Sequence, residues 1–485
     1  MILDLMIQNA NIVRPYANGI QPGNIGIREG KIAYVGTEAL EAKSYFDAAE
    51  RLAFPGVIDA HTHIGIYQSF EKDAPTETAS AVSGGVTCML HYVRTGSLYL
   101  NQGGSWKYFF PALLKANEGH HYCDYGFHVS PIQGMQIPEM EWMVKDCGCP
   151  NFGEVFMFYG SHGLHGRTDK QHSWLMLDED EQYDIGHFDL ICREAAYLQK
   201  KYPDLAELIC VSWHCETPEI LRLQEQLVRK IDDLKGLVAY SAARPPHSEA
   251  VAIQVVGALA HAAGLTQVNI LHITSREAME AALAVRELYP EITFGLEVTA
   301  GHLLLDDHCP LGALAKVNPP LRSPQDKAYL WEKVLDGTLE WVMTDHANCP
   351  LDIKVNPENP TDIWQAKAGF GGTEFLLPGI FSEGLKRGLS LNKIAALTSG
   401  MPAKRFGLSG KGDIAVGKDA DIALLDPNET WIVQAANSFS AQGYTPFEGL
   451  EITGKVKATF VRGQLQFHEG KITGNQSGLF VKRPA

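Results

Sequence analysis

Phe54-Pro-Gly-Val-Ile-Asp-Ala-His-Thr-His63 is an apolar run that ends in two histidines one residue apart. On an extended segment, residues i and i+2 point to the same side, so His61 and His63 can reach one metal ion at the end of a strand. The chain holds 18 histidines, and a His-x-His pair can also simply close a strand. Whether this pair binds a metal therefore depends on what the rest of the chain places beside it.

Composition places the chain among large globular proteins. Its 485 residues are enough for one barrel with an accessory layer, and 45% of them are hydrophobic. No run of 18 apolar residues suggests a membrane span, and the first residues lack the pattern of a signal peptide. The net charge of −16, without a block of Lys and Arg, argues against nucleic acid or an anionic membrane as the main partner.

The nine cysteines are scattered and odd in number. Cys147 and Cys149 form a Cys-x-Cys, but no second pair completes a zinc knuckle. We therefore expect reduced thiols in a cytoplasmic protein.

Both ends of the chain have the character of a small β-domain. Residues 1–53 and 405–470 contain short alternating runs separated by turn signals such as Arg28-Glu-Gly-Lys31. Since neither end is long enough to bury two sheet faces alone, we expect them to form one β-sandwich domain. The last residues, 471–485, are expected to form a C-terminal arm that packs on a neighbouring subunit.

The middle of the chain, residues 54–404, alternates short apolar strands with helical patterns, which are clearest over 249–263 and 275–288. This alternation predicts an α/β fold, a closed parallel (β/α)8 TIM-type barrel whose chemistry lies at the carboxyl ends of the strands. The expected strands are Val57–Asp59, Val86–Tyr92, Tyr125–Val129, Glu154–Tyr159, Leu208–Trp213, Val268–Ile273, Thr293–Val298 and Leu339–Thr344.

Several of these strands carry side chains that bind metal ions. The candidates are His61, His63, Glu154, His214, His272 and Asp345. Each histidine alone is more often a hydrogen-bonded residue at a barrel end. Four imidazoles and two carboxylates directed into one barrel are a much rarer coincidence, and Zn²⁺ and similar ions favour such ligands.

Eight motifs occur in the order of a known family. They are Asp59-Ala-His-Thr-His63, Val155–Tyr159, Ala243–Glu249, His272–Glu277, Glu297–Leu305, Asn318–Arg322, Thr344–His346 and Thr445–Gly449. This set resembles the amidohydrolase superfamily, and within it the dihydropyrimidinases and hydantoinases, over essentially the whole chain. The resemblance implies a metal-dependent hydrolase that opens a cyclic amide, ureide or imide ring of the hydantoin or dihydropyrimidine type.

One position departs from that family. Where its members carry a lysine carboxylated by CO₂, which bridges two metal ions, this chain has Glu154. A glutamate carboxylate is shorter but offers the same two oxygens, as in other amidohydrolase branches that this arrangement resembles. We therefore expect Glu154 to bridge two divalent ions, with Zn²⁺ as the first candidate. The alternatives are a one-metal site and a bridge formed by Lys170.

The resemblance also implies roles in catalysis. A metal-bound hydroxide would attack the ring carbonyl, with Asp345 as general base and then general acid. Tyr159 would donate a hydrogen bond to the developing oxyanion, and Tyr159, Asn318 and His302 would contact the substrate. The alternatives are an aromatic residue at the barrel rim for Tyr159, an ordinary loop residue for Asn318, and support of the metal ligands for His302.

The substrate is less well defined by the sequence. Dihydroorotases typically carry an arginine two residues after the His-x-His, to hold a substrate carboxylate, and this chain has Gly65 there. We therefore expect an uncharged or weakly acidic ring, with segment 161–167 helping to shape its pocket. Arg244 and Glu249 are expected to form a structural ion pair.

Other functions remain open at this point. One is an allantoinase-like or other amidohydrolase that acts on a different C–N bond. Another is a non-catalytic scaffold, as in one relative of this branch that lost its metal ligands, although the full ligand set present here argues against it. The resemblance further implies a homo-tetramer that acts on a small molecule.

Overall fold

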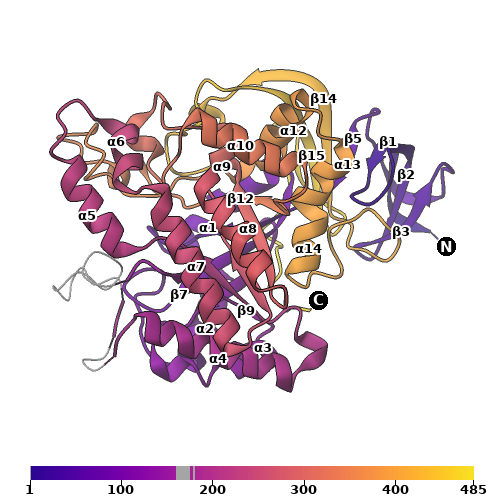
Figure 1. Ribbon diagram of the computed structural model, residues 1–485. Helices are drawn as coiled ribbons and strands as arrows, with labels where there is room; N and C mark the ends of the chain where they lie inside the picture. Colours follow the sequence, from indigo (N-terminus) through magenta and orange to yellow (C-terminus); the bar gives the residue numbers. More distant parts are fainter. Residues whose placement is uncertain (1, 160–174, 178–180, 485) are drawn as a thin grey trace.

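The computed structural model of the protein describes residues 2–159, 175–177 and 181–484. Two β-sheets organise this part of the chain, and helices surround one of them (Figure 1). Segment 161–167, expected to shape the pocket, and Lys170, the alternative bridge, lie outside the described residues.

One sheet is the predicted parallel barrel. Its strands follow one another in chain order, and a backbone bridge between Thr62 and His346 brings the first strand to the last. Each strand expected from the sequence is present. The strands are β6 (Val57–Thr62), β7 (Val86–Arg94), β8 (Asp124–Ser130), β9 (Asn151–Phe156), β10 (Cys210–His214), β11 (Gln267–Ile270), β12 (Thr293–Thr299) and β13 (Trp341–Met343).

Strand β9 begins earlier than the sequence suggests. It was expected over 154–159 and runs over Asn151–Phe156. Asn151 is a typical turn residue, yet here it is buried, and its Oδ1 accepts a hydrogen bond from Ser212 Oγ at 2.8 Å. Because a neighbouring strand satisfies this amide, the strand can start at a polar residue.

The helices pack around the barrel (Figure 1), and the two clearest helical patterns are confirmed in α7 and α8. Ser275 Oγ caps α8 by accepting from the Ala278 amide at 3.2 Å, and Gly264 ends α7 with a φ of +74°. The helices are α1 (Phe70–Ser83), α2 (Trp106–Asn117), α3 (Met140–Lys145), α4 (Ile185–Lys201), α5 (Pro218–Val228), α6 (Gly236–Ala243), α7 (Pro246–Ala263), α8 (Arg276–Leu288), α9 (Ala300–Leu304), α10 (Pro324–Leu335), α11 (Leu351–Lys354), α12 (Leu376–Lys386), α13 (Leu391–Ala395) and α14 (Met401–Arg405).

The second sheet joins the two ends of the chain, as predicted. Ala53 lies opposite Leu424 where β5 pairs with β14, and the same core contains Ile25 from the first end and Phe460 from the last. In sheet order the strands are β17 (Lys471–Ile472), β16 (Gln464–His468), β15 (Glu451–Val461), β14 (Ile422–Ile432), β5 (Leu52–Pro55), β1 (Leu3–Val13), β2 (Ile20–Arg28) and β3 (Lys31–Gly36), while β4 (Ala42–Asp47) also pairs with β1.

The C-terminal tail packs on its own barrel. The backbone of Tyr125 in β8 donates to the Leu479 carbonyl at 3.0 Å and accepts from the Val481 amide at 2.7 Å. Arg483 is only 2% exposed and donates to the Phe127 carbonyl. The described residues of the tail therefore find hydrogen-bond partners on β8 of their own chain, and the expectation that the tail packs on a neighbouring subunit stays a prediction.

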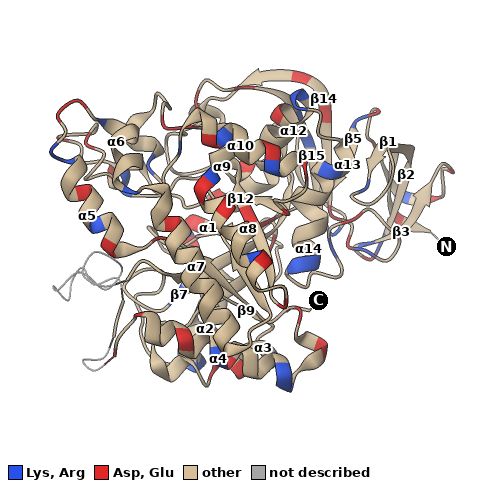
Figure 2. Cartoon of the chain, viewed as in Figure 1, with Lys and Arg blue, Asp and Glu red and all other residues tan. Residues whose placement is uncertain are grey.

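Acidic and basic side chains are mixed over the outer helices (Figure 2). No helix in the described part of the chain is long and apolar enough to cross a bilayer. The cysteines carry free thiols, as expected from their scattered positions, and both Cys147 and Cys149 are buried.

Candidate active site

Buried imidazoles and carboxylates converge at the carboxyl ends of the barrel strands. They are His61 and His63 at the end of β6, Glu154 on β9, His214 on β10, His272 just after β11 and Asp345 just after β13. Their ligand atoms form two overlapping groups that could each hold a metal ion, namely His61 with His63 and Asp345, and His61 with Glu154 and His272. These two groups contain five of the six candidate ligands, and His214 lies outside them but 3.0 Å from Glu154 Oε1.

Two of these residues sit on strained backbone. His272 has a φ of +34° and Asp345 a φ of +55°, in the left-handed region that side chains other than glycine rarely adopt. Such positions cost about 1–3 kcal/mol each and are concentrated at functional sites, where the surrounding structure holds them. Both residues leave their strands at these positions, which turns their side chains toward the cluster.

Glu154 lies at the centre of the cluster and turns its two oxygens toward different histidines. Its Oε1 is 3.0 Å from His214 Nδ1 and 3.0 Å from His272 Nε2. Its Oε2 is 3.5 Å from His63 Nε2 and 4.0 Å from His61 Nε2. On the other side, Asp345 Oδ1 is 3.0 Å from His63 Nε2 and 3.3 Å from His61 Nε2. One carboxylate therefore stands between two pairs of imidazoles.

Glu297 on β12 orients His61. The Nδ1 of His61 is 2.6 Å from Glu297 Oε1, while Glu297 Oε2 accepts from the indole of Trp341 at 3.1 Å. Because the carboxylate accepts only, Nδ1 carries a proton and donates it to Glu297, and Nε2 faces the cluster. This buried Nε2 has no hydrogen-bond partner among the described residues, as expected of an atom that binds a metal.

Glu216 orients His214 in the same way. Its Oε2 is 2.7 Å from His214 Nε2, which leaves Nδ1 directed at Glu154. The same carboxylate also pairs with Arg244, whose Nε donates to Oε1 at 2.9 Å. The expected pair of Arg244 with Glu249 is therefore wrong. Glu249 binds Arg322 instead, because Glu216 is the carboxylate that lies beside Arg244.

The carboxylates of the cluster stabilise the protonated, positively charged form of the neighbouring histidines. Burial opposes the charged form of His61, but Glu297 and Asp345 outweigh it and raise its pKa to about 10. Burial likewise opposes the charged form of His214, and its bonds to Glu154 and Glu216 raise its pKa to about 9. Despite its own burial, Glu154 has a pKa well below the usual range, because His214 and His272 donate to it. An environment that retains protons so strongly also suits a divalent cation.

Replacing Glu216 by alanine is expected to lower the free energy of unfolding by about 3–5 kcal/mol, measured by urea unfolding. The change leaves the buried guanidinium of Arg244 without a carboxylate, and breaking one side of a buried pair is costly. Glu291→Ala, which breaks the exposed pair with His261, is the control and should change stability little. Equal losses in the two variants would contradict a structural role for Glu216.

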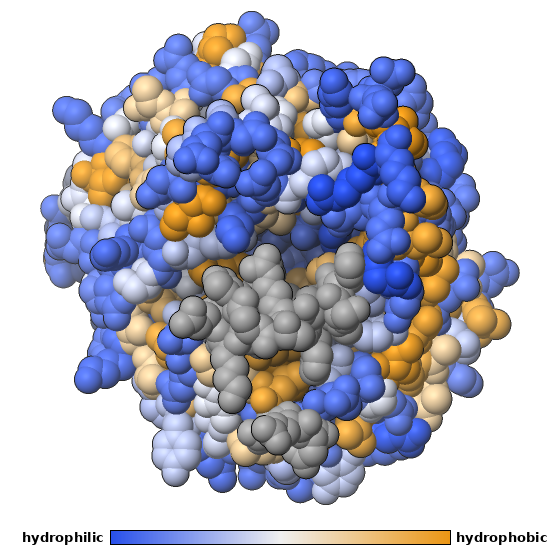
Figure 3. All heavy atoms as spheres, turned by 90° about the vertical axis from the view of Figure 1, so that its left-hand side faces the viewer, coloured by the Kyte–Doolittle hydropathy of each residue, from blue (hydrophilic) through white to orange (hydrophobic). Residues whose placement is uncertain are grey.

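A cavity of about 120 Å³ adjoins the cluster. Besides several of the ligands, its walls include the aromatic rings of Tyr67, Phe156 and Phe158 and the amide of Asn318. The face of the molecule that carries α5 and α6 is hollowed near its centre (Figure 3), and α5 follows directly after β10, so this face lies over the carboxyl ends of the strands. Such a pocket, with mostly apolar walls and a few polar groups, is typical of a small-molecule site.

The three expected substrate contacts differ in position. Asn318 lines the cavity, and its Oδ1 accepts from the Tyr240 hydroxyl at 2.5 Å. His302 is buried outside the lining, between Thr299 Oγ1 at 2.7 Å and the Pro319 carbonyl at 3.2 Å, and burial lowers its pKa to about 4. Tyr159 packs its ring on Phe188 and does not line the cavity. This position does not support the expected hydrogen bond from Tyr159 to the oxyanion. Asn318, in contrast, lies at the cavity wall, where it can contact a substrate.

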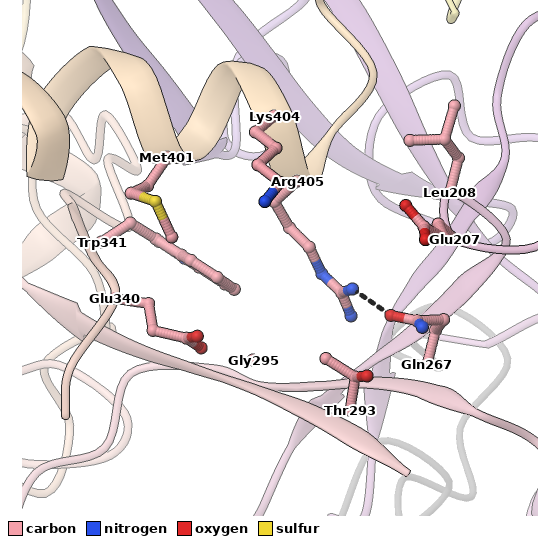
Figure 4. Close-up of a pocket in the computed structure, with 10 residues that line it drawn as sticks. All are labelled: Glu207, Leu208, Gln267, Thr293, Gly295, Glu340, Trp341, Met401, Lys404 and Arg405. Atoms are coloured by element: carbon pink, nitrogen blue, oxygen red, sulfur yellow. Dashed lines mark hydrogen bonds between the residues drawn. The ribbon is translucent and has the colours of Figure 1, made fainter. Parts of the chain in front are cut away.

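A second cavity, of about 250 Å³, lies at the opposite end of the barrel (Figure 4). It is lined by Gln267, Thr293 and Trp341, where β11, β12 and β13 begin. Figure 4 shows the guanidinium of Arg405 directed at Gln267, and its Nε also donates to Asn269 at 2.7 Å. The Arg405 guanidinium already donates its hydrogen bonds to residues of the protein. We therefore assign this cavity a structural role, where the beginnings of the barrel strands meet α14.

Glu216 and Glu297 are the functional residues that the sequence analysis missed. Glu216 lies two residues after His214, and Glu297 lies on a barrel strand. The i, i+2 rule that drew attention to His61 and His63 applies equally to His214 and Glu216 and would have found the latter. Glu297 begins one of the eight motifs, but its role could not be assigned from the sequence, because its partner His61 is on a different strand.

The chain is similar to known proteins over almost its whole length. The model of the Amidohydrolase family matches residues 373–466. An allantoinase from Rubrobacter xylanophilus is 29% identical over 99% of this chain and 97% of its own, and a D-hydantoinase from Ralstonia pickettii is 29% identical over 99% of each chain. The crystal structure of a dihydropyrimidinase from Brevibacillus agri superposes with a TM-score of 0.83, at 25% identity, over 99% of this chain and 98% of its own. With the barrel, the second sheet and the ligand cluster in place, the chain belongs to the amidohydrolase superfamily, in its hydantoinase-like branch.

Proposed function

We propose that this protein is a metal-dependent hydrolase that opens a cyclic amide, ureide or imide ring of the hydantoin or dihydropyrimidine type. The observation that carries the proposal is the position of Glu154, whose two oxygens face two different pairs of histidines beside a small cavity. The names of the relatives, D-hydantoinase and dihydropyrimidinase, support the same class of substrate.

The residues present fit two divalent metal ions. His61, His63 and Asp345 would hold the first ion and His214 and His272 the second, with Glu154 between them. The unpartnered Nε2 of His61 supports this assignment, and Zn²⁺ suits a set of imidazoles and carboxylates. When bound, such ions polarise a carbonyl oxygen and lower the pKa of water toward neutrality.

Asp345 is the proton carrier in this proposal. It lines the cavity, its pKa lies below the usual range because the charge of His61 and a hydrogen bond from His63 outweigh burial, and it is therefore ionised at neutral pH. Its carboxylate takes the proton from the attacking water and passes it to the ring nitrogen as the C–N bond breaks. Asn318, held by Tyr240, presents its amide to the ring at the cavity wall.

A panel of cyclic ureides and imides tests this function. The metal-loaded protein is incubated with hydantoin, dihydrouracil, succinimide and allantoin, and ring opening is followed by loss of ring absorbance and by mass spectrometry. Opening of hydantoin or dihydrouracil is the expected result. Activity on allantoin alone would favour the second candidate, an allantoinase, which the Rubrobacter xylanophilus relative suggests. A protein that holds no metal and opens no ring would support the scaffold alternative.

The protein is also proposed to be a cytoplasmic homo-tetramer. The resemblance to hydantoinases supports the assembly, and the free thiols support the compartment. Size-exclusion chromatography with light scattering at micromolar concentration should give about four times the mass of the 53.3 kDa chain. A wild-type mass equal to one chain would contradict the assembly.

A further inference from the structure

Arg94 is a buried cation in the same cavity. It ends β7, and its side chain is among those that line the pocket beside His63, Glu154 and Asp345. Arg94 pairs in register with Ser130 of β8, and Ser130 Oγ donates to the Glu154 carbonyl at 2.8 Å, so neighbouring strand ends place it next to the cluster. Only 4% of Arg94 is exposed.

Among the residues that the structure describes, this guanidinium has no counter-ion. Arg94 takes part in none of the ion pairs of the described residues, and its Nε has no hydrogen-bond partner there. Its guanidinium carbon lies over two aromatic rings, with the Phe156 ring centroid at 5.3 Å and that of Tyr99 at 5.7 Å. Burying an unpaired charge is costly, so a fold that keeps one in its active-site cavity points to a ligand that completes it.

We propose that Arg94 binds a carboxylate carried by the substrate, so that the preferred substrates are cyclic amides or ureides with an acidic side group. This inference deepens the proposed function and rests on it for the nature of the ring. The free Nε–H and an adjacent Nη–H of a guanidinium form a fork that matches the two oxygens of a carboxylate. Because Arg94 is buried, a charge-assisted pair formed there is stronger than one in water.

Arg94 can bind a substrate carboxylate although Gly65 stands where dihydroorotases carry their arginine. The absence of an arginine two residues after the His-x-His suggested a substrate without a carboxylate. The structure instead brings an arginine into the same cavity from the next strand, at a position no motif marks. The carboxylates of Glu154 and Asp345 do not serve as its partners, since both are turned to the imidazoles of the cluster.

Two pairs of matched ligands test the proposal. The first is hydantoin with a carboxymethyl group at C5 and its carbamoylmethyl counterpart, which differ only in charge, compared by kcat/KM. The second is cyclopentylacetate and cyclopentylacetamide, which have no ring amide and are compared by calorimetric binding to the metal-loaded protein. The wild type should prefer the carboxylate of each pair by about 10- to 100-fold, the effect of a charge-assisted hydrogen bond.

Arg94→Gln should reduce this preference to less than about threefold in both pairs, and Arg94→Lys, which keeps the charge but not the fork, should retain part of it. Arg193→Gln, which removes an exposed arginine on α4, is the control and should keep the wild-type ratio. Circular dichroism and metal content show that the variants are folded and loaded. A wild type without preference, a preference that survives in Arg94→Gln, or equal losses for both members of a pair would overturn the proposal.

The two proposals fail in different ways. If the protein opens no ring but binds cyclopentylacetate through Arg94, the carboxylate site stands and the proposed function fails. If it opens the carbamoylmethyl ring as well as the carboxymethyl ring and Arg94→Gln leaves their ratio unchanged, the hydrolase stands and the role of Arg94 fails.

Discussion

Glu154→Ala is expected to lose at least one of two bound metal ions and to lower kcat by about 10³-fold or more. Among the described residues, Glu154 is the one carboxylate whose oxygens face both pairs of histidines, so its removal would take a negative ligand from both proposed ion positions. Lewis-acid stabilisation by a metal ion contributes several kcal/mol, and each 1.36 kcal/mol of barrier is tenfold in rate. Inductively coupled plasma mass spectrometry of the two proteins, prepared in parallel, gives the metal content per chain.

A control variant must show that replacing a glutamate elsewhere in the chain does not by itself reduce the metal content or the activity. Glu291→Ala, at an exposed position, should keep two ions and full activity. Two tightly held ions in both Glu154→Ala and the wild type would show that Glu154 is not the bridge. A single ion in the wild type, lost in the variant, would favour the one-metal alternative.

Glu154→Lys tests how this chain differs from relatives with a carboxylated lysine. Without CO₂ the new ammonium would place a positive charge among the imidazoles, and the metal content should fall. Added bicarbonate can convert the amine to a carbamate with two oxygens, so activity should be partly regained. For the wild type, bicarbonate should not enhance activation by metal, because a glutamate needs no such modification.

The barrel strands and the candidate ligands at their ends could be predicted from the sequence, because each is marked by residues that are close together along the chain. The barrel strands are short apolar runs separated by helical patterns, and their ends carry the ligands, so the order of residues along the chain is enough to find both. The start of β9 was predicted three residues too late, because Asn151, whose buried amide is satisfied by Ser212, is typical of a turn, and other strand ends differ by up to three residues. The sequence also predicted that the two ends of the chain form one sheet domain, as the pairing of β5 with β14 shows. The reason is that neither end is long enough to bury two sheet faces alone.

The parts that the sequence did not predict depend on contacts between distant elements. Arg244 lies five residues before Glu249 but pairs with Glu216, because the fold turns its side chain toward β10. Arg94 gives no signal at all, since an arginine at the end of an apolar strand normally reaches solvent. Its burial is visible only once Phe156 and Tyr99 are placed around it.

Asp345→Asn is expected to lower kcat by about 10²- to 10⁴-fold, the range for loss of a general acid–base group. Asparagine has nearly the same shape but cannot take up a proton. The wild-type carboxylate has a pKa below the usual range, because His61 and His63 outweigh its burial, so this base is ionised at neutral pH and its activity is lost only as pH falls through that lowered pKa. The pH profile of kcat/KM in the wild type should therefore show no acid limb from Asp345 near neutrality.

Asp345 is also a candidate metal ligand, and the experiment must separate the two roles. If Asp345 acted only as a ligand, Asp345→Asn at saturating metal and full occupancy would regain wild-type kcat. If it also carries the proton, the defect persists at full occupancy. The nitrogen that leaves becomes that of a carboxamide in succinimide and that of a ureide in dihydrouracil, and since both anions are strong bases, both need a proton as the C–N bond breaks. The loss in Asp345→Asn should accordingly be large for both substrates, and wild-type kcat at full occupancy with either one would contradict proton delivery by Asp345.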